Sequence, residues 1–308
     1  MFPSAAATLL FMTWDSGKRI FRLPFRSEMQ VCRPVFSPNG TYLAVGVEVL
    51  AKSGKKPIVQ VWDWRRGKRL HNFERHSKMI DRVLFSPDAR LLISLSQDRK
   101  FVWTISSGTV VYEFPDNLPV DDVAFGPAGR RLYVLRPGKG QAGQLDIYDT
   151  TNWKKIGAMH LVKARYVLEV SPDGRFFRSL GANKTPAGRI ATSYFYDCKT
   201  GKQLASLPSV EECVFSADGK HLFGKVGQSI RCWSTTTWKP SSRFREHSEP
   251  IQRVVWSRNG QMVLTFGENI RCWDSTTGRE RWDNPCRLTG SLYAEQRCSF
   301  CFHSEQNR

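Results

Sequence analysis

A short sequence element recurs six times in this chain, and no other feature limits the possible folds as strongly. Each copy reads as an apolar strand end, a turn of the Ser-Pro-Asp-Gly kind and a second apolar run, which predicts a β-hairpin. The residue before the turn is at position 36 in the first copy and at position 256 in the sixth. The five intervals between the copies give a mean period of 44 residues. Such a period indicates a repeat architecture built from one supersecondary unit. The copies are VFSPNGTYL at 35–43, LFSPDARLL at 84–92, AFGPAGRRL at 124–132, EVSPDGRFF at 169–177, VFSADGKHL at 214–222 and VWSRNGQMV at 255–263.

An aromatic residue marks a second recurring element. A short β-branched or apolar stretch, such as IVQVW or LDIYD, precedes each aromatic, and a turn follows it, in most copies with Gly or Asn. No segment shows sustained helical periodicity. Each repeat therefore supplies about four short strands, and the chain is predicted to be all-β. The seven aromatics are Trp14, Trp62, Trp103, Tyr148, Tyr196, Trp233 and Trp273.

Between about residues 8 and 284 the chain resembles the WD-repeat family of β-propellers. The resemblance rests on the six hairpins and on the Trp-Asp dipeptides that begin at Trp14, Trp62 and Trp273. It implies a seven-bladed β-propeller of four-stranded antiparallel blades. The Gly-His dipeptide of the family is absent, and tyrosine replaces tryptophan at Tyr148 and Tyr196, so the chain is a divergent member.

The aromatic count and the period both predict seven blades, with residues 1–303 as a single propeller domain and 304–308 as a C-terminal tail. The N-terminal piece supplies only two strands, at about 8–14 and 18–25, so the first blade lacks two strands. We expect residues 287–303 to complete this blade, closing the ring with strands from both termini and removing two open edges. Because this segment has no Ser-Pro-Asp-Gly turn, the alternative is that the end of the sequence is not a true blade.

A Ser/His/Asp trio within one repeat suggests a hydrolase at first sight. In WD-repeat propellers, however, the order His, Ser or Thr, Asp and Trp is similar to a buried structural network in which the polar groups satisfy one another. We therefore predict a structural and not a catalytic role for these residues. A later repeat has the same order, with Glu268-Asn269 in place of the aspartate. The predicted network residues are His76, Ser94, Asp98 and Trp103, and, in the later repeat, His247, Thr265 and Trp273.

No motif predicts a cofactor, a metal ion or a catalytic residue. The segment GKGQAG at 138–143 matches a dinucleotide-loop pattern but leads into a strand, whereas a phosphate site of that kind needs a helix N-terminus. Cys286, Cys298, Cys301 and His303 lie close together, as zinc ligands do, but they form only one close pair, so apolar packing of the cysteines is favoured. An enzyme with an active site in the central channel is the least favoured hypothesis.

The chain is strongly basic, with 46 Lys and Arg against 28 Asp and Glu, a net charge of +18. Such a charge favours acidic partners. Three basic insertions, at 48–57, 136–144 and 181–190, lie between the second and third strands of their repeats, and insertions on one face of a repeat scaffold commonly carry binding. Acidic residues in neighbouring connections and lysines at the other turns favour the alternative of scattered solubilising charge. The candidate partner-binding residues are Lys52, Lys55, Lys56, Arg136, Lys139, Lys184 and Arg189.

These observations predict a non-enzymatic protein-interaction scaffold that binds a protein or peptide, with acidic partners favoured, through loops on one face. The alternative is nucleic-acid binding through the same basic loops, although the insertions contain no aromatic residue to stack on bases. No run of about 18 apolar residues is present, so no membrane partner is expected. Because no basic residue precedes the apolar N-terminal stretch, a cytoplasmic protein is predicted, as a monomer or part of a larger assembly.

Overall fold

β-Strands are the only regular secondary structure in the part of the chain that the computed structural model describes. Two compact units divide the chain: the first unit, Met1–Leu118 with Leu292–Arg308, and the second unit, Pro119–Ser291. The described residues are 8–13, 19–24, 29–49, 56–116, 118–140, 142–186, 188–211, 213–216, 218–226, 229–243, 251, 253–256, 262–266, 270–274, 279–284 and 302–303.

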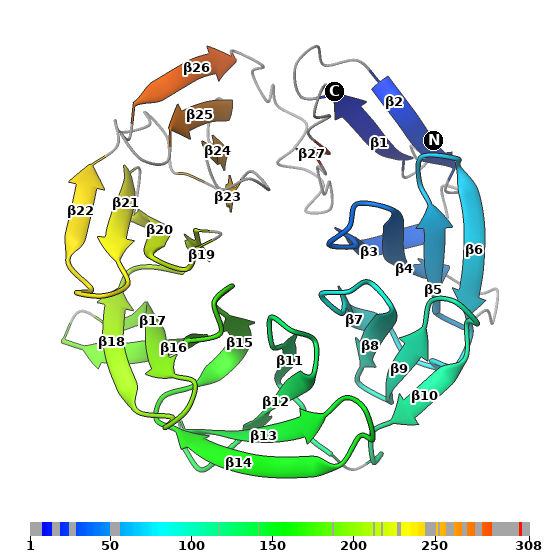
Figure 1. The fold of residues 1–308 in the computed structure, drawn as a ribbon, viewed down its shortest axis with the longest axis horizontal. Helices are drawn as coiled ribbons and strands as arrows, with labels where there is room; N and C mark the ends of the chain where they lie inside the picture. The colour runs from blue at the N-terminus through cyan, green and yellow to red at the C-terminus, as the bar shows by residue number, and fades with distance from the viewer. Residues whose placement is uncertain are drawn as a thin grey trace. The chain divides into compact units, whose positions relative to one another are not determined.

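The described residues of the first unit form three β-sheets (Figure 1). Two of these sheets are four-stranded and antiparallel, and their strands follow chain order, β3-β4-β5-β6 and β7-β8-β9-β10. The third sheet has the order β2-β1-β27. The strands are β1 (Thr8–Thr13), β2 (Arg19–Pro24), β3 (Met29–Phe36), β4 (Tyr42–Val49), β5 (Ile58–Asp63), β6 (Lys68–Phe73), β7 (Ile80–Phe85), β8 (Leu91–Ser96), β9 (Lys100–Thr104), β10 (Val110–Glu113) and β27 (Phe302–His303).

The sheet that joins both ends of the sequence bears on the predicted ring closure. β27 pairs with β1, placing Phe302 opposite Met12 and His303 opposite Thr13. The two strands are parallel, whereas a strand that completed an antiparallel blade would run antiparallel to β1. Residues 287–301 lie outside the described residues, so completion of a four-stranded first blade stays a prediction.

The described residues of the second unit form four antiparallel sheets of four strands each. The strand orders again follow the chain, β11 to β14, β15 to β18, β19 to β22 and β23 to β26. All-β structure from four-stranded antiparallel sheets is therefore confirmed. The strands are β11 (Asp122–Phe125), β12 (Arg131–Pro137), β13 (Gly143–Asp149), β14 (Lys155–Leu161), β15 (Arg165–Val170), β16 (Phe176–Thr185), β17 (Gly188–Asp197), β18 (Gln203–Pro208), β19 (Cys213–Phe215), β20 (His221–Val226), β21 (Ser229–Ser234), β22 (Pro240–Arg243), β23 (Arg253–Trp256), β24 (Met262–Phe266), β25 (Ile270–Asp274) and β26 (Glu280–Asn284).

Apolar side chains pack between neighbouring sheets of the same unit. In the first unit, Phe73 of β6 stacks on Trp103 of β9 with ring centroids 4.3 Å apart. In the second unit, Tyr133 of β12 meets Phe177 of β16 edge to face at 4.6 Å. Among the described recurring aromatics, Trp103, Tyr148, Tyr196, Trp233 and Trp273 are buried and Trp62 is partly buried, because each sheet buries its apolar face by packing against the next sheet. This explains why the repeat preserves an aromatic at this position.

The Ser-Pro-Asp-Gly turns share one hydrogen-bond pattern. The serine hydroxyl donates to the carboxylate two residues later and accepts from the backbone N–H five residues later, as Ser171 does with Asp173 at 2.6 Å and Phe176 at 2.9 Å. Ser86 and Ser216 make the same pair of bonds. The side chains thus close the hairpin without a longer loop, which is why these residue types recur there.

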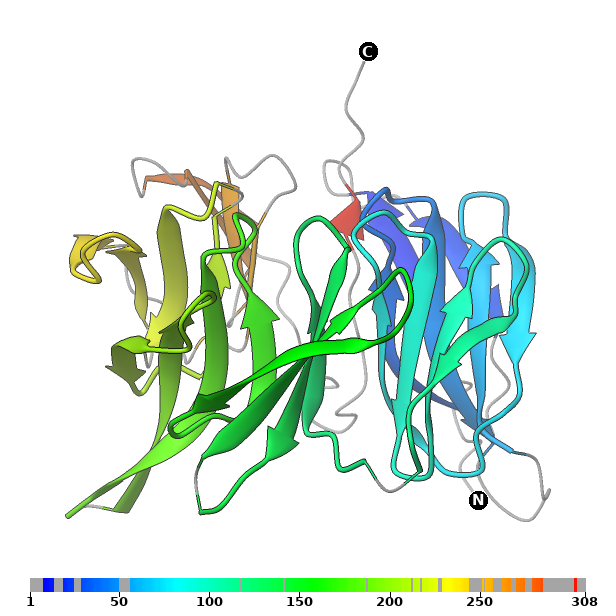
Figure 2. The same ribbon diagram turned by 60° about the horizontal axis from the view of Figure 1, so that its bottom comes forward.

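The turn after each aromatic strand bonds to this first turn. The Trp64 indole donates to the Gly40 carbonyl at 3.0 Å, and the Thr150 and Thr235 hydroxyls donate to the Gly129 and Gly219 carbonyls at 2.7 Å. Both turns therefore lie at one end of the sheet. Figure 2 shows the strands running between two ends with turns at each. The second-to-third-strand turns and the connections between sheets consequently lie at the opposite end, as antiparallel pairing requires.

Candidate functional site

The structure brings His76, Ser94, Asp98 and Trp103 together in the first unit. His76 Nε2 lies 2.7 Å from Ser94 Oγ, and the Trp103 indole N–H donates to the same hydroxyl at 2.8 Å. His76 Nδ1 lies 3.5 Å from Asp98 Oδ1. His76 and Ser94 are completely buried, so Ser94 is not placed to attack a substrate from solvent. Ser94 thus links His76 to Trp103 by hydrogen bonds, whereas His76 Nδ1 and Asp98 Oδ1 are buried and make only their mutual 3.5 Å contact.

Burial and hydrogen bonding control the charges of this cluster. Desolvation lowers the pKa of His76 despite the opposing effect of Asp98. Burial alone would raise the pKa of Asp98, but hydrogen bonds from Ser96 and Ser77 lower it well below its ordinary value. The Ser77 backbone N–H and hydroxyl donate to Asp98 Oδ2 at 2.6 and 2.7 Å. The ionised carboxylate therefore holds the connection before β7 against the turn between β8 and β9.

The other repeats replace this cluster in different ways. The Trp273 indole donates to Thr265 Oγ1 at 2.8 Å, whereas His247 and Glu268-Asn269 lie outside the described residues. Tyr196 occupies the position in its sheet that Trp103 occupies in the β7–β10 sheet. The Tyr196 hydroxyl donates directly to the Val162 carbonyl, in the connection between β14 and β15. Tyr196 thus reaches the connection between sheets directly, whereas Trp103 reaches His76 through Ser94.

The connection 162–164 is held between two hairpins of the second unit. A Cβ atom on Gly143 of β13 would lie 2.7 Å from the Ala164 carbonyl, and one on Gly181 of β16 would lie 2.5 Å from the Lys163 carbonyl. Both positions require glycine because the connection passes so close. Lys163 has φ of 63°, and Ser209 has φ of 61° in the corresponding connection before β19. The left-handed residue is therefore a recurring feature of the link between sheets.

The segment 181–190, expected to be an insertion loop, is instead a continuation of the β16–β17 hairpin. The strands stay paired from Phe176 opposite Asp197 to Thr185 opposite Gly188. Lys184 lies opposite Arg189 in this ladder. Gly, Pro and Asn favoured a loop in the sequence, but Thr185, Ile190 and Thr192 are β-branched and continue the strands to a tight reversal.

The seven predicted partner-binding residues have different surroundings. Lys52 and Lys55 lie outside the described residues, and Lys56 is exposed in the first unit. Lys139 and Arg189 are exposed in the second unit, where Lys184 occupies β16. Arg136 differs from these residues because its Nη1 lies 2.9 Å from the carboxylate of buried Asp146, which also binds Lys155 Nζ at 2.7 Å. Arg136 therefore stabilises a buried charge.

Two charged residues near this end are structural. Asp122 is buried, and its carboxylate accepts the Leu168 N–H of the next sheet at 2.9 Å. Arg178, only 3% exposed, contacts Glu169 at 2.9 Å and donates to the Ser193 hydroxyl at 3.1 Å and to the Glu211 carbonyl. No sequence signal identifies Arg178, because it stands at a strand position where the other repeats have no charge.

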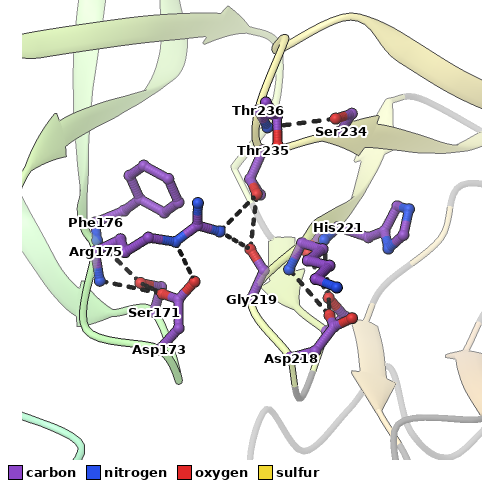
Figure 3. Close-up of polar contacts among 12 residues, drawn as sticks. Ser171, Asp173, Arg175, Phe176, Asp218, Gly219, His221, Ser234, Thr235 and Thr236 are labelled. Carbon is purple, nitrogen blue, oxygen red and sulfur yellow. Dashed lines mark hydrogen bonds and ion pairs between the residues drawn. The ribbon is translucent and has the colours of Figure 1, made fainter.

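At the opposite end of the strands, Arg175 joins two neighbouring sheets of the second unit (Figure 3). Its Nε lies 2.5 Å from Asp173 Oδ2, and its Nη2 reaches the Gly219 carbonyl at 3.4 Å and Thr235 Oγ1 at 3.5 Å. The guanidinium also lies over the Phe176 ring, 4.7 Å from its centroid. Arg175 therefore ties two neighbouring sheets together at this end of the second unit.

A candidate site, which we call the connection surface, lies at the end of the second unit that carries the connections between sheets. It consists of Lys139 in the β12–β13 turn, Val162 and Lys163 in the connection 162–164, and Arg189 on β17. Leu161 pairs with Gly143, so the β12–β13 turn lies directly beside Val162. Arg189 lies about 10 Å along the hairpin from the close approach at Gly181. The surface combines three cations with one exposed apolar side chain.

The described residues contain no helix long and apolar enough to cross a bilayer. Within the same residues, no three His, Cys, Asp or Glu side chains gather closely enough to hold a metal ion. Cys286, Cys298 and Cys301, considered above as zinc ligands, lie outside the described part of the chain.

Comparison with known proteins relates this architecture to WD-repeat proteins. The chain is 26% identical over 167 residues to eukaryotic translation initiation factor 3 subunit I of Lodderomyces elongisporus, covering 52% of this chain and 48% of that relative. It is 31% identical over 84 residues to small ribosomal subunit protein RACK1z of Oryza sativa subsp. japonica, covering 27% and 23% of the two chains. The C-terminal WD40 domain of Sif2 has a similar fold, with a TM-score of 0.60, 20% identity and coverage of 83% and 71%.

The chain spans about half the length of the first of these relatives. No protein-family model matches it. The repeated hairpins, the four-stranded sheets and the similarity to WD-repeat relatives together define the class: this chain is a divergent WD-repeat protein. The number of blades and the closure of the ring stay predictions.

Proposed function

We propose that this protein is a non-enzymatic interaction scaffold that binds a protein or peptide through the connection surface of the second unit. The observation that carries the proposal is the exposed Val162 side chain beside the partly buried Lys163, with Lys139 and Arg189 exposed on the two flanking hairpins that fix this backbone. A fixed backbone lowers the entropic cost of binding, because fewer groups must be ordered.

The relatives support a scaffold. Two of them are named as a subunit of a translation initiation factor and as a protein of the small ribosomal subunit, and both are therefore components of assemblies. We also propose a cytoplasmic location, as expected from the sequence. The nucleic-acid alternative has no matching observation, because none of the four residues of the connection surface is aromatic.

Site-specific photo-crosslinking tests the proposal. A photoreactive amino acid replaces Arg189 in one variant and Lys199, which is exposed at the opposite end of the strands, in a control. We expect a protein adduct from position 189 and none from position 199. The adduct is expected to disappear when Lys139→Gln and Lys163→Asn are added, and Asn is chosen because it tolerates the left-handed backbone at 163. Equal capture from both positions would contradict the proposal.

A further inference from the structure

We infer that the connection surface recognises an acidic peptide segment that contains one apolar residue, with Val162 as the contact for that residue. This inference rests on the proposed function and names the chemistry of its partner. Val162 is 61% exposed, more than any other large hydrophobic residue in the described part of the chain, the next being Ile156 at 54%. Its neighbours Leu161 and Ala164 are completely buried.

The exposure of Val162 follows from how its backbone is held. The Tyr196 hydroxyl binds the Val162 carbonyl, and burial raises the pKa of Tyr196, so this hydroxyl stays a neutral donor. On either side, Leu161 and Ala164 anchor the connection in the core. The Val162 side chain is therefore displayed on a fixed backbone, where contact with a partner removes apolar surface from water at little entropic cost.

The positive charges near Val162 favour acidic residues in the rest of the peptide. Lys163 Nζ lies 3.3 Å from the Asn183 amide oxygen and 5.6 Å from the centre of the Tyr194 ring, both of them neutral groups. These contacts orient the ammonium group without neutralising it. Lys139 and Arg189 are exposed on the two flanking hairpins. A peptide with carboxylates on both sides of an apolar side chain therefore matches the surface in charge and in position.

The neighbouring connections limit this basic surface. Asp121 is exposed in the connection before β11, and Glu211 is exposed in the connection before β19. The cations are therefore concentrated at the middle connection of the three. A long uniform polyanion would meet repulsion at both flanks, whereas a short acidic segment would not.

Fluorescence anisotropy with the full chain tests the inference. The probe is a labelled peptide of about nine residues, roughly 30 Å when extended, with glutamates on both sides of a central leucine. A second peptide has serine in place of the leucine. We expect the leucine peptide to bind about tenfold more tightly, since apolar burial on Val162 adds to the charge contacts. Val162→Ser is expected to reduce this preference to less than about twofold, and its high exposure makes it a mild change for folding.

A charge-matched control separates specific contacts from net charge. Lys139→Gln with Lys163→Asn and Arg189→Gln is expected to weaken binding of both peptides by about tenfold or more. Arg130→Gln with Lys199→Gln and Lys220→Gln removes the same charge from exposed positions at the opposite turns, and we expect less than about a twofold effect.

Two outcomes would overturn the inference. Equal binding of the leucine and serine peptides would leave only general electrostatic attraction. Tighter binding of a labelled single-stranded oligonucleotide, unaffected by Val162→Ser, would assign the surface to nucleic acid. If the two peptides bind equally, photo-crosslinking from position 189 separates the two proposals. A protein adduct at that position would support the proposed scaffold function even though the inference about an acidic peptide with an apolar residue had failed.

Discussion

Ser94 and Arg178 differ in how far the sequence reveals their roles. Ser94 lies between His76 and Trp103 in the chain, and the structure brings all three side chains into contact, in the order that the resemblance to WD repeats implies. Arg178 occupies a strand interior, and its contacts with Glu169 and Ser193 depend on how the sheet packs against its neighbour. Recurrent local order predicts the first kind of residue, whereas nothing local predicts the second.

We predict that Gly219→Ala strongly destabilises the protein. Gly219 has φ of 70°, a conformation costing an alanine about 1–2 kcal/mol. A Cβ atom there would also lie 2.3 Å from Asp173 Oδ2, which bonds to Arg175 (Figure 3). The combined loss in the free energy of unfolding is expected to be about 2–4 kcal/mol, measured by urea denaturation.

Gly140→Ala is the matched control. Gly140 has φ of 66°, but a Cβ atom there would meet no atom within 4 Å. For Gly140→Ala the free energy of unfolding is expected to fall by about 1–2 kcal/mol, because only the left-handed backbone conformation disfavours alanine there. Equal losses for the two variants would show that the overlap with Asp173 relaxes without cost.

At the level of elements, the β16–β17 hairpin determines where the candidate site lies. The sequence predicts an insertion at 181–190, but the structure continues both strands through it. Pairing between strands depends on both segments, so the amino-acid composition of one segment is a poor predictor of whether it forms a paired strand. The hairpin in turn fixes the connection 162–164 through Gly181 and Tyr196.

We predict that Tyr196→Phe loosens this connection. The substitution removes the hydrogen bond to the Val162 carbonyl and keeps the buried ring. The free energy of unfolding is expected to fall by about 1–2 kcal/mol, and amide exchange at residues 162–164 is expected to accelerate. Tyr194→Phe is the comparison, because Asn183 retains its contact with Lys163 when the Tyr194 hydroxyl is lost. Unchanged exchange in Tyr196→Phe would show that the two glycine contacts alone hold the connection.

At the level of the whole molecule, the repeat predicts one propeller domain over residues 1–303, while the structure resolves two compact units. We predict a single cooperative thermal transition, because stacked repeats depend on their neighbours for burial. Scanning calorimetry checks this by comparing the calorimetric and van't Hoff enthalpies, which agree for a two-state transition. Two separable transitions would instead assign the two units to independent domains.

The sequence by itself determined the all-β class, the recurring hairpin and the place in a strand of the six recurring aromatics from Trp62 to Trp273. These features are local: turn residues, alternating apolar residues and a fixed period specify them within one repeat. Tertiary structure decided that Arg136 binds the buried Asp146 and that Val162 is exposed between two completely buried neighbours. It did so because burial and close approach depend on which strands are neighbours in space, and that information lies in no single segment of the chain.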